Sequence, residues 1–295
     1  MVLQTQNLTK SYGSRRGVID INLDVGEGEI FGFLGPNGAG KSTTIRLLTG
    51  FLNATSGSAT ILGRDCWWES ATIKQDVGYV AGDVRLYSWL TARKSFQIVG
   101  EIRGTDIKKR GLELAERFRL EPDLPVRKMS RGNRQKLALV TALAHEPRLV
   151  ILDEPTSGLD PLMQDTLADC LRELATTGNT VFFSSHTLSE VETLCDRVAI
   201  VRDGRIAIDD RIQNLKQHAP RTVTLTYESE ELAQQSELPD SATLVRRYKR
   251  EVVVTTTGSS VDFIRWATAQ SLVDISISPP SLEALFRSYY KPEAE

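Results

Sequence analysis

The stretch that decides the fold lies near the N-terminus and reads Gly35-Pro36-Asn37-Gly38-Ala39-Gly40-Lys41-Ser42-Thr43. An apolar run, 30–34, precedes it, and residues 43–48 continue with helical spacing. Its glycines allow a tight turn that brings backbone N–H groups close to an anion, and the following helix points its positive end there. Lys41 supplies a cation for the outer phosphates, and Ser42 is placed to ligate Mg²⁺. We therefore predict a strand, loop and helix that hold a nucleotide.

A second apolar run, residues 149–152, ends in two acidic residues, Asp153 and Glu154. A carboxylate at Asp153 is placed to hold the metal, and Glu154 can polarise an attacking water molecule. Adjacent acids also occur as plain solvated strand ends, but the phosphate-binding loop favours the functional interpretation. The chain has no Asn-Lys-x-Asp motif, which disfavours guanine nucleotides.

The third candidate is His186, which follows the apolar run ending at Phe183. A lone histidine is more often structural than catalytic, but this one ends a strand beside the predicted phosphate site. A neutral imidazole there can bond a phosphate oxygen and the water held by Glu154. We predict that His186 senses the γ-phosphate.

Residues 1–215 alternate short β-rich runs with longer helical stretches, a pattern typical of an α/β domain with a mainly parallel sheet. A helical insert is predicted over about residues 84–135, with helices at 92–103 and 107–118. The predicted strands are 29–34, 77–80, 149–152, 180–184 and 198–202.

A separate small α+β domain is predicted over residues 216–295. A hairpin with its turn near Lys249 and Arg250 joins two of its strands, and residues 228–241 are expected to be disordered. A terminal amphipathic helix is expected at 281–290. The remaining predictions are strands at 222–227, 244–248, 252–256 and 273–277 and a helix at 261–270.

Composition excludes several classes of protein. The 295 residues carry a formal net charge of −2, so no electrostatic signal for nucleic acid is present. No apolar run approaches the roughly 20 residues that cross a bilayer. Residues 1–10 lack the apolar core of a secretory signal, so we expect a cytoplasmic protein. Three cysteines, Cys66, Cys170 and Cys195, favour neither a disulfide framework nor a zinc site.

Together these motifs resemble the nucleotide-binding subunit of an ABC transporter, over about residues 2–210. The resemblance implies an α/β P-loop NTPase fold with residues 35–43 as the Walker A loop, residues 149–153 as the Walker B strand and Glu154 as the catalytic glutamate. It also implies that His186 is the switch histidine and that Tyr12 stacks on adenine.

The signature loop of this family corresponds to Met129-Ser130-Arg131-Gly132-Asn133-Arg134-Gln135. Ser130 stands where a helix N-cap belongs, and Gly132 permits close approach. Arg131 replaces the first glycine of the family pattern and adds a cation near the triphosphate. The resemblance implies that this loop, with Asp160 of the D-loop (residues 157–160), contributes to binding the nucleotide held by another subunit.

Two further segments bear on a membrane partner. Gly82 stands where the family has a glutamine that senses the metal, and Asp83 is the candidate substitute. The aromatic and apolar stretch 86–90 either forms a groove for a cytoplasmic helix of the partner or packs within the helical insert.

The resemblance implies an ATPase that uses ATP and Mg²⁺, dimerises head to tail with a second copy of itself or a paralogous subunit, and powers an integral membrane permease. Its place would be cytoplasmic, at the inner face of the cell membrane. The variant motifs and the C-terminal appendage resemble exporters of drugs or antibiotics of the ABC-2 type. No nucleic acid is expected as a partner.

Two other interpretations stay open. The first is a soluble ABC-type ATPase with a regulatory or mechanical role and no permease, although the chain has only one P-loop and no long coiled coil. The second makes the last domain a binding site for a small regulatory ligand. An appendage that stabilises a dimer is the simpler role for that domain.

Overall fold

The computed structural model describes residues 1–13, 15–256, 260–278 and 282. Two compact units divide the chain, Met1–Asp210 and Arg211–Glu295, and each is described by itself. A boundary after residue 215 would cut helix α8 (Ile212–His218).

A six-stranded sheet forms the centre of the first unit, with five neighbouring strands parallel. Strands β3, β7 and β8 are buried along their whole length, because helices and a second sheet cover both faces. All five strands predicted in this unit are confirmed to within a residue at either end. In spatial order the strands are β10 (Arg205–Arg211), β9 (Arg197–Arg202), β3 (Ile30–Leu34), β8 (Thr180–Ser185), β7 (Leu149–Asp153) and β6 (Val77–Val80).

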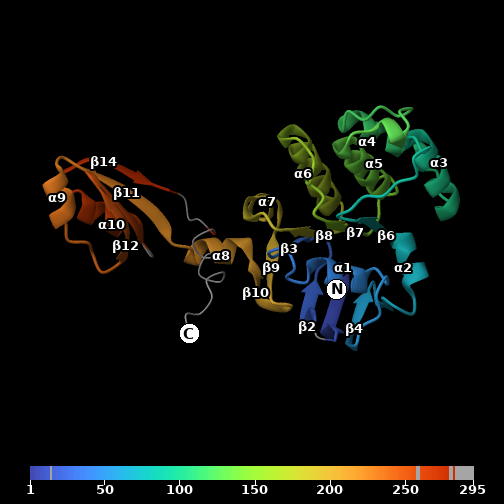
Figure 1. Cartoon of the computed structure of the whole chain (residues 1–295), viewed down its shortest axis with the longest axis horizontal. Helices are drawn as coiled ribbons and strands as arrows, with labels where there is room; N and C mark the ends of the chain where they lie inside the picture. The colour runs from blue at the N-terminus through green and yellow to red at the C-terminus, as the bar shows by residue number, and fades with distance from the viewer. Residues whose placement is uncertain (14, 257–259, 279–281, 283–295) are drawn as a thin grey trace. The chain divides into compact units, whose positions relative to one another are not determined.

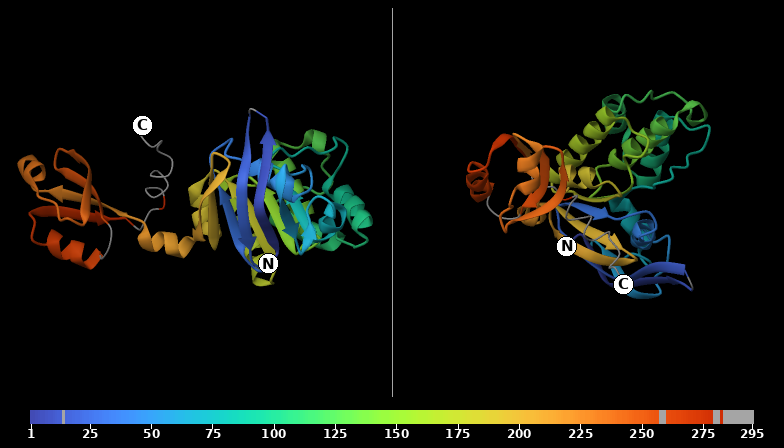
Figure 2. Two further views of the ribbon diagram at one scale, coloured as in Figure 1. Left: turned by 90° about the horizontal axis from the view of Figure 1, so that it is seen from below. Right: turned by 60° about the vertical axis from the view of Figure 1, so that its left-hand side comes forward.

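A second, antiparallel sheet covers one face of this unit (Figure 2). None of its strands is predicted from the sequence, because their apolar residues are interrupted by polar ones and their pairing contains several register shifts. The strands are β2 (Arg15–Val25), β1 (Leu3–Tyr12), β4 (Ser56–Ile61) and β5 (Arg64–Asp65).

Helix α1 (Lys41–Leu48) lies between the two sheets, and Ile45 and Leu48 pack in one apolar core with residues of both. Helices α6 (Pro161–Thr176) and α7 (Leu188–Leu194) cover the opposite face of the six-stranded sheet (Figure 1). Phe182 lies in this core, and its ring stacks on that of Phe31 with the two ring centroids 5.7 Å apart. The loop before α1 is thus fixed between two packed layers.

The helical segment contains the helices predicted at 92–103 and 107–118, which are confirmed to within a residue at either end. Its first helix, α3, has a well-defined start and end: Thr91 accepts a hydrogen bond from the N–H of Lys94, and Gly104 ends the helix with φ of 67°. The last helix continues past the predicted end of the insert to Leu143. After the short α2 (Ser70–Asp76), the elements are α3 (Ala92–Arg103), α4 (Lys108–Arg117), the 3₁₀ turn η1 (Val126–Lys128) and α5 (Arg131–Leu143).

The second unit contains an antiparallel sheet of four strands with its own apolar core. The predicted hairpin is confirmed, since Tyr248 pairs with Glu251 across a two-residue turn in which Lys249 has a positive φ of 50°. In spatial order the strands are β12 (Ala242–Tyr248), β13 (Glu251–Thr256), β11 (Arg221–Tyr227) and β14 (Leu272–Ile277).

Among the described residues, three helices belong to the second unit: α8, α9 (Glu230–Gln235) and α10 (Ser260–Ala267). The expectation of disorder over 228–241 is wrong, because Ser229 caps α9 and Ala233 is buried in the apolar core. The predicted terminal helix at 281–290 falls, except for residue 282, outside the described residues.

The three cysteines are free and buried. Burial raises the pKa of Cys66 to about 12 and that of Cys170 to about 11, so these thiols stay protonated near neutral pH. Among the described residues, no helix is both long and apolar enough to cross a membrane.

Phe182→Ala should lower the free energy of unfolding of the first unit by about 3–5 kcal/mol, because it removes a fully buried ring from the core beneath β3 and β8. Urea unfolding followed by circular dichroism measures the change. As a control, Ile102→Ala removes a side chain that is 79% exposed and should change the free energy by less than about 0.5 kcal/mol. Equal effects of the two substitutions would contradict the assigned core.

Candidate functional site

The loop between β3 and α1 adopts a conformation that requires glycine. At Gly35 a Cβ atom would lie 2.5 Å from the carbonyl oxygen of Val201. Gly40 has φ of 113°, and a Cβ there would lie 2.6 Å from Cγ1 of Val18. The N–H of Gly35 donates to the oxygen of Ser185 at 3.2 Å, which ties the loop to the end of β8. The loop is therefore held by close backbone contacts on both sides.

Lys41 begins α1, two residues before the predicted start of that helix. Its side chain is only 5% exposed, and Nζ donates to the carbonyl oxygens of Gly35 (2.7 Å) and Pro36 (3.2 Å). The ammonium also lies 3.3 Å from Oε1 of Glu154. Ser42 follows on the first helical turn with an exposed side chain.

Asp153 ends β7 and is 7% exposed. The parallel register places it beside Ser184 of β8, whose fully buried hydroxyl donates to Oδ1 of Asp153 at 2.7 Å. Ser184 is not among the site residues predicted from the sequence. The signal that could have identified Ser184 is its position near the end of a predicted strand, since the ends of parallel strands lie together at one edge of the sheet.

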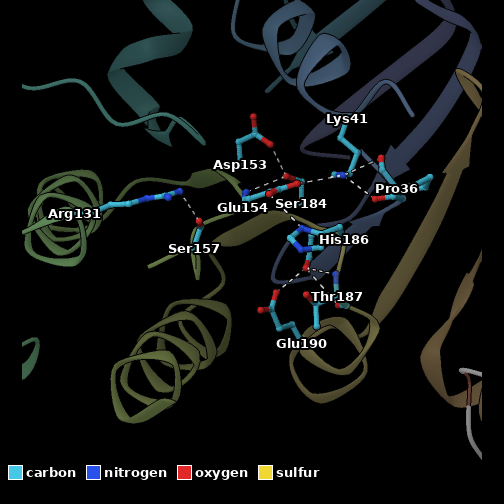
Figure 3. A network of polar contacts seen from close by, with 12 residues as sticks. Pro36, Lys41, Arg131, Asp153, Glu154, Ser157, Ser184, His186, Thr187 and Glu190 are labelled. Atoms are coloured by element: carbon cyan, nitrogen blue, oxygen red, sulfur yellow. Dashed lines mark hydrogen bonds and ion pairs between the residues drawn. The ribbon is translucent and has the colours of Figure 1, made fainter. Parts of the chain in front are cut away.

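Glu154 connects the predicted groups (Figure 3). Its Oε2 lies 3.2 Å from Nδ1 of His186, while Oε1 faces Lys41, so one carboxylate bridges both side chains. Its backbone has a left-handed φ of 49°, and its N–H lies 3.2 Å from both the carbonyl and the hydroxyl oxygen of Ser184. Such a φ in a residue other than glycine costs about 1–3 kcal/mol and persists only where the surrounding contacts hold it.

The loop that carries His186 is ordered by Ser185. The Ser185 hydroxyl donates to Oε2 of Glu190 at 2.6 Å and accepts from the N–H of Thr187 at 2.8 Å. The imidazole of His186 remains 53% exposed. Its ring thus faces solvent on one side and Glu154 on the other.

The signature residues lie at the start of α5, away from Lys41 (Figure 3). Ser130 is the N-cap, and its hydroxyl accepts from the N–H of Asn133 at 3.1 Å. Arg131 donates from Nη2 to the hydroxyl of Ser157 at 2.9 Å. Asp160 caps α6 by accepting from the N–H of Met163 at 3.0 Å. The signature loop is therefore adjacent to the D-loop of its own chain, and its Arg131 lies away from Lys41.

Tyr12 lies next to the phosphate-binding loop through Gly17. A Cβ on Gly17 would lie 3.4 Å from the Tyr12 ring, and the carbonyl oxygen of Gly17 is 3.6 Å from where a Cβ on Gly40 would be. The Tyr12 side chain is 42% exposed. Its ring is available for contact beside the loop.

Gly82 lies against the Walker B carboxylate, because a Cβ there would be 3.5 Å from Oδ2 of Asp153. Asp83 is 77% exposed and pairs with Arg85 at 2.8 Å. The carboxylate of Asp83 therefore forms an ion pair with a surface arginine, and Gly82 leaves the space beside Asp153 without a side chain.

A groove of about 660 Å³ lies between α3 and α5. Tyr87 and Trp89 stand on its rim, 72% and 51% exposed, with ring centroids 6.1 Å apart. Burial, and then the charge of Arg103, lower the pKa of His145 in this groove to about 4, so its imidazole is neutral at pH 7. The groove is thus mainly apolar, with few polar groups inside it.

Fold and site define an ATPase of the P-loop class. The family model described as "ABC transporter" matches residues 18–157. The chain is 39% identical over 218 residues to the bacitracin transport ATP-binding protein BcrA of Bacillus licheniformis, covering 73% of this chain and 71% of that one. It is 38% identical over 210 residues to the linearmycin resistance ATP-binding protein LnrL of Bacillus subtilis, covering 70% and 68%.

Two solved structures have the same fold. One is an ATP-binding subunit of an ABC transporter, with a TM-score of 0.70, 28% identity and 74% and 92% of the two chains covered. The other is the dimeric ATP-binding cassette MJ0796 in a post-hydrolysis state bound to ADP and Pi, with a TM-score of 0.65, 26% identity and 71% and 98% covered. The chain therefore belongs to the ATP-binding subunits of ABC transporters, which confirms the resemblance and the P-loop fold. It is an ATPase whose hydrolysis of ATP is coupled to transport.

Ser184→Ala should lower kcat for ATP several-fold, because Asp153 loses its buried donor. Stability should fall by about 1–2 kcal/mol. Steady-state hydrolysis and urea unfolding measure the two effects. Ser95→Ala is the matched control: it removes another buried hydroxyl, which donates to the oxygen of Thr91 at 2.9 Å, and should lower stability alike with kcat unchanged. Equal kcat in the two variants would remove Ser184 from the site.

Proposed function

We propose that the chain is the ATPase subunit of an exporter of antibiotics or similar small molecules, working as a head-to-tail dimer beneath a membrane permease. The single observation that carries the proposal is the cluster of Lys41, Glu154 and His186, in which one carboxylate bridges the phosphate-binding lysine and a partly exposed histidine. The functions of BcrA and LnrL, bacitracin transport and linearmycin resistance, favour antibiotics as the cargo.

In this proposal the ammonium of Lys41 binds the outer phosphates. A phosphate carries the same kind of charge as the Glu154 carboxylate, so the two are alternative partners of one buried cation. Binding of ATP then leaves Glu154 to orient and polarise the attacking water, with His186 sensing the γ-phosphate. The bridge seen between the three side chains supports this division of roles.

Asp153 and Ser42 fit a magnesium site. Mg²⁺ prefers oxygen ligands and is usually held by one or two protein groups together with substrate phosphates. Asp153 offers a carboxylate oriented by Ser184, and the exposed hydroxyl of Ser42 lies on the first turn after the phosphate-binding loop. Bound Mg²⁺ would neutralise charge that develops on the phosphates, while Lys41 and the backbone N–H groups of residues 35–43 hold their oxygens.

We assign adenine recognition to Tyr12. A half-exposed ring beside the loop gives a face on which a purine can stack, and stacking needs no hydrogen-bond pattern from the base. Lys10 lies 5.8 Å from the ring centroid and adds positive charge on the same side.

The dimer follows from where the signature loop lies. Ser130, Arg131 and Gly132 lie at the start of α5. Arg131 bonds to Ser157 of the D-loop and lies away from Lys41 of the same chain (Figure 3). A second chain related by a two-fold axis can bring its signature loop over this nucleotide and receive the same in return. The dimeric state of MJ0796 supports this arrangement.

The groove between α3 and α5 is the proposed docking site for a cytoplasmic helix of the permease, which would hold the subunit at the inner face of the membrane. Its mainly apolar lining and two exposed aromatic rims suit the apolar face of a helix. This assigns the 86–90 stretch to partner binding and not to packing of the helical insert.

Glu154→Gln should keep ATP affinity but lower kcat at least 100-fold, because an amide cannot accept the proton of the attacking water. A dimer stable in MgATP should then appear by size-exclusion chromatography. Glu116→Gln, the same change on the exposed face of α4, is the control and should hydrolyse ATP as the wild type does. Unchanged turnover in Glu154→Gln would end the proposal.

The double variant Tyr87→Ala and Trp89→Ala removes the aromatic rim of the groove. In pull-downs from detergent extract, the amount of polytopic membrane protein that co-purifies with it should fall about tenfold. Hydrolysis by the isolated subunit should stay the same. Trp68→Ala, which removes an 83% exposed ring outside the groove, is the control and should retain the partner. Retention by the double variant would contradict the docking site.

A further inference from the structure

The segment that follows Glu154 is held by the first two turns of α5. Gln135 donates from Nε2 to the carbonyl oxygen of Pro155 at 2.9 Å in a buried bond. Arg131 donates to the Ser157 hydroxyl at 2.9 Å. A Cβ on Gly132 would lie 2.7 Å from the carbonyl oxygen of Gly158, so the two backbones are in direct contact. The signature helix and the D-loop of one chain thus form one packed unit.

Arg131 makes two kinds of contact with this segment. Its Cγ, Cδ and Nε atoms lie 3.6–3.7 Å from where a Cβ on Gly158 would be, so the aliphatic stem crosses that glycine. The guanidinium then reaches the hydroxyl of Ser157 (Figure 3). Gly158 has φ of +82° and suits the turn beneath this stem.

Ser157 in turn is tied to the catalytic glutamate. The N–H of Ser157 donates to the carbonyl oxygen of Glu154 at 3.2 Å, which closes a turn of four residues. Glu154 is the first residue of this turn and has the unfavourable left-handed φ. Fixing the last residue of a closed turn restricts the first, so a bond to the Ser157 side chain acts on the backbone of Glu154.

We propose that Arg131 is a positioning residue for Glu154, acting through Ser157 and not through the phosphates. The inference rests on the proposed function. Because Ser130 and Gly132 on either side of Arg131 belong to the loop that caps the nucleotide of the second subunit, the arginine links occupancy of that site to the catalytic glutamate of its own chain. Cooperativity between the two sites then depends on the Arg131 and Ser157 pair.

A double-mutant cycle on the full chain tests this. Arg131→Met keeps most of the aliphatic stem and removes the donors, and Ser157→Ala removes the acceptor. We expect each to lower kcat about tenfold and the Hill coefficient for ATP toward 1. The double variant should be no worse than either single one, because both break the same bond. The affinity of the isolated subunit for MgATP, measured by fluorescence titration, should stay within twofold.

Arg131→Lys keeps a charged donor and should restore at least part of the lost kcat. Arg127→Met makes the same change at an exposed arginine outside this unit and should leave kcat unchanged. Circular dichroism confirms that each variant is folded, and the lysine variant keeps the test decisive if the methionine variant unfolds.

Three results would overturn the inference: wild-type kcat in Arg131→Met, a silent Ser157→Ala beside a severe Arg131→Met, or losses that add in the double variant. The last two would place the guanidinium on the nucleotide. Wild-type hydrolysis and its loss in Glu154→Gln are measured first. If the wild type does not hydrolyse ATP, or if Glu154→Gln still does, the proposed function is wrong. If both results are as expected and the losses in the cycle add, only the role of Arg131 is wrong.

Discussion

The site depends on a buried ammonium. Lys41 lies at the bottom of the loop with 5% of its side chain exposed, and a charge so placed costs several kcal/mol unless negative groups surround it. Two carbonyl oxygens satisfy it in part, and the carboxylate of Glu154 supplies the opposite charge. In the proposed function, Lys41 needs an anionic partner and a phosphate can replace Glu154 in that role. Phosphate binding is then connected to the position of the Glu154 carboxylate.

The parallel sheet explains why these groups meet. The C-terminal ends of parallel strands lie at one edge, where α/β proteins bind their ligands. Here β3 leads to the loop of Lys41, the neighbouring β8 ends at Ser184 and Ser185, and β7 ends at Asp153. Backbone pairing thus brings together three segments, although β3 lies more than 100 residues before β7 and β8 in the sequence. Ser184 then orients the carboxylate of Asp153 on the adjacent strand.

Much of this was predictable, for reasons that differ by element. Buried parallel strands are apolar on both faces, so β3, β7 and β8 stand out, and the loop of Lys41 needs residue types at fixed spacing. The antiparallel sheet was missed because its register shifts break the alternation of apolar residues. Ser157 was predicted as part of the D-loop, but its bond to Arg131 was not, and Ser184 was missed altogether. Both depend on contacts between segments, which spacing along the chain does not encode.

Helix α5 extends from the D-loop contact to the apolar groove. Its first residue, Arg131, bonds to Ser157, while Ala138 and Ala142 farther along line the groove proposed for the permease. The helix has 13 residues and so spans about 20 Å. In the proposed assembly, a packed helix of this length acts as a rod that connects a partner bound in the groove to the Glu154 turn through the bonds at its start. The bond from Arg131 to Ser157, at the position where the family pattern has glycine, is the contact on which this proposed connection depends.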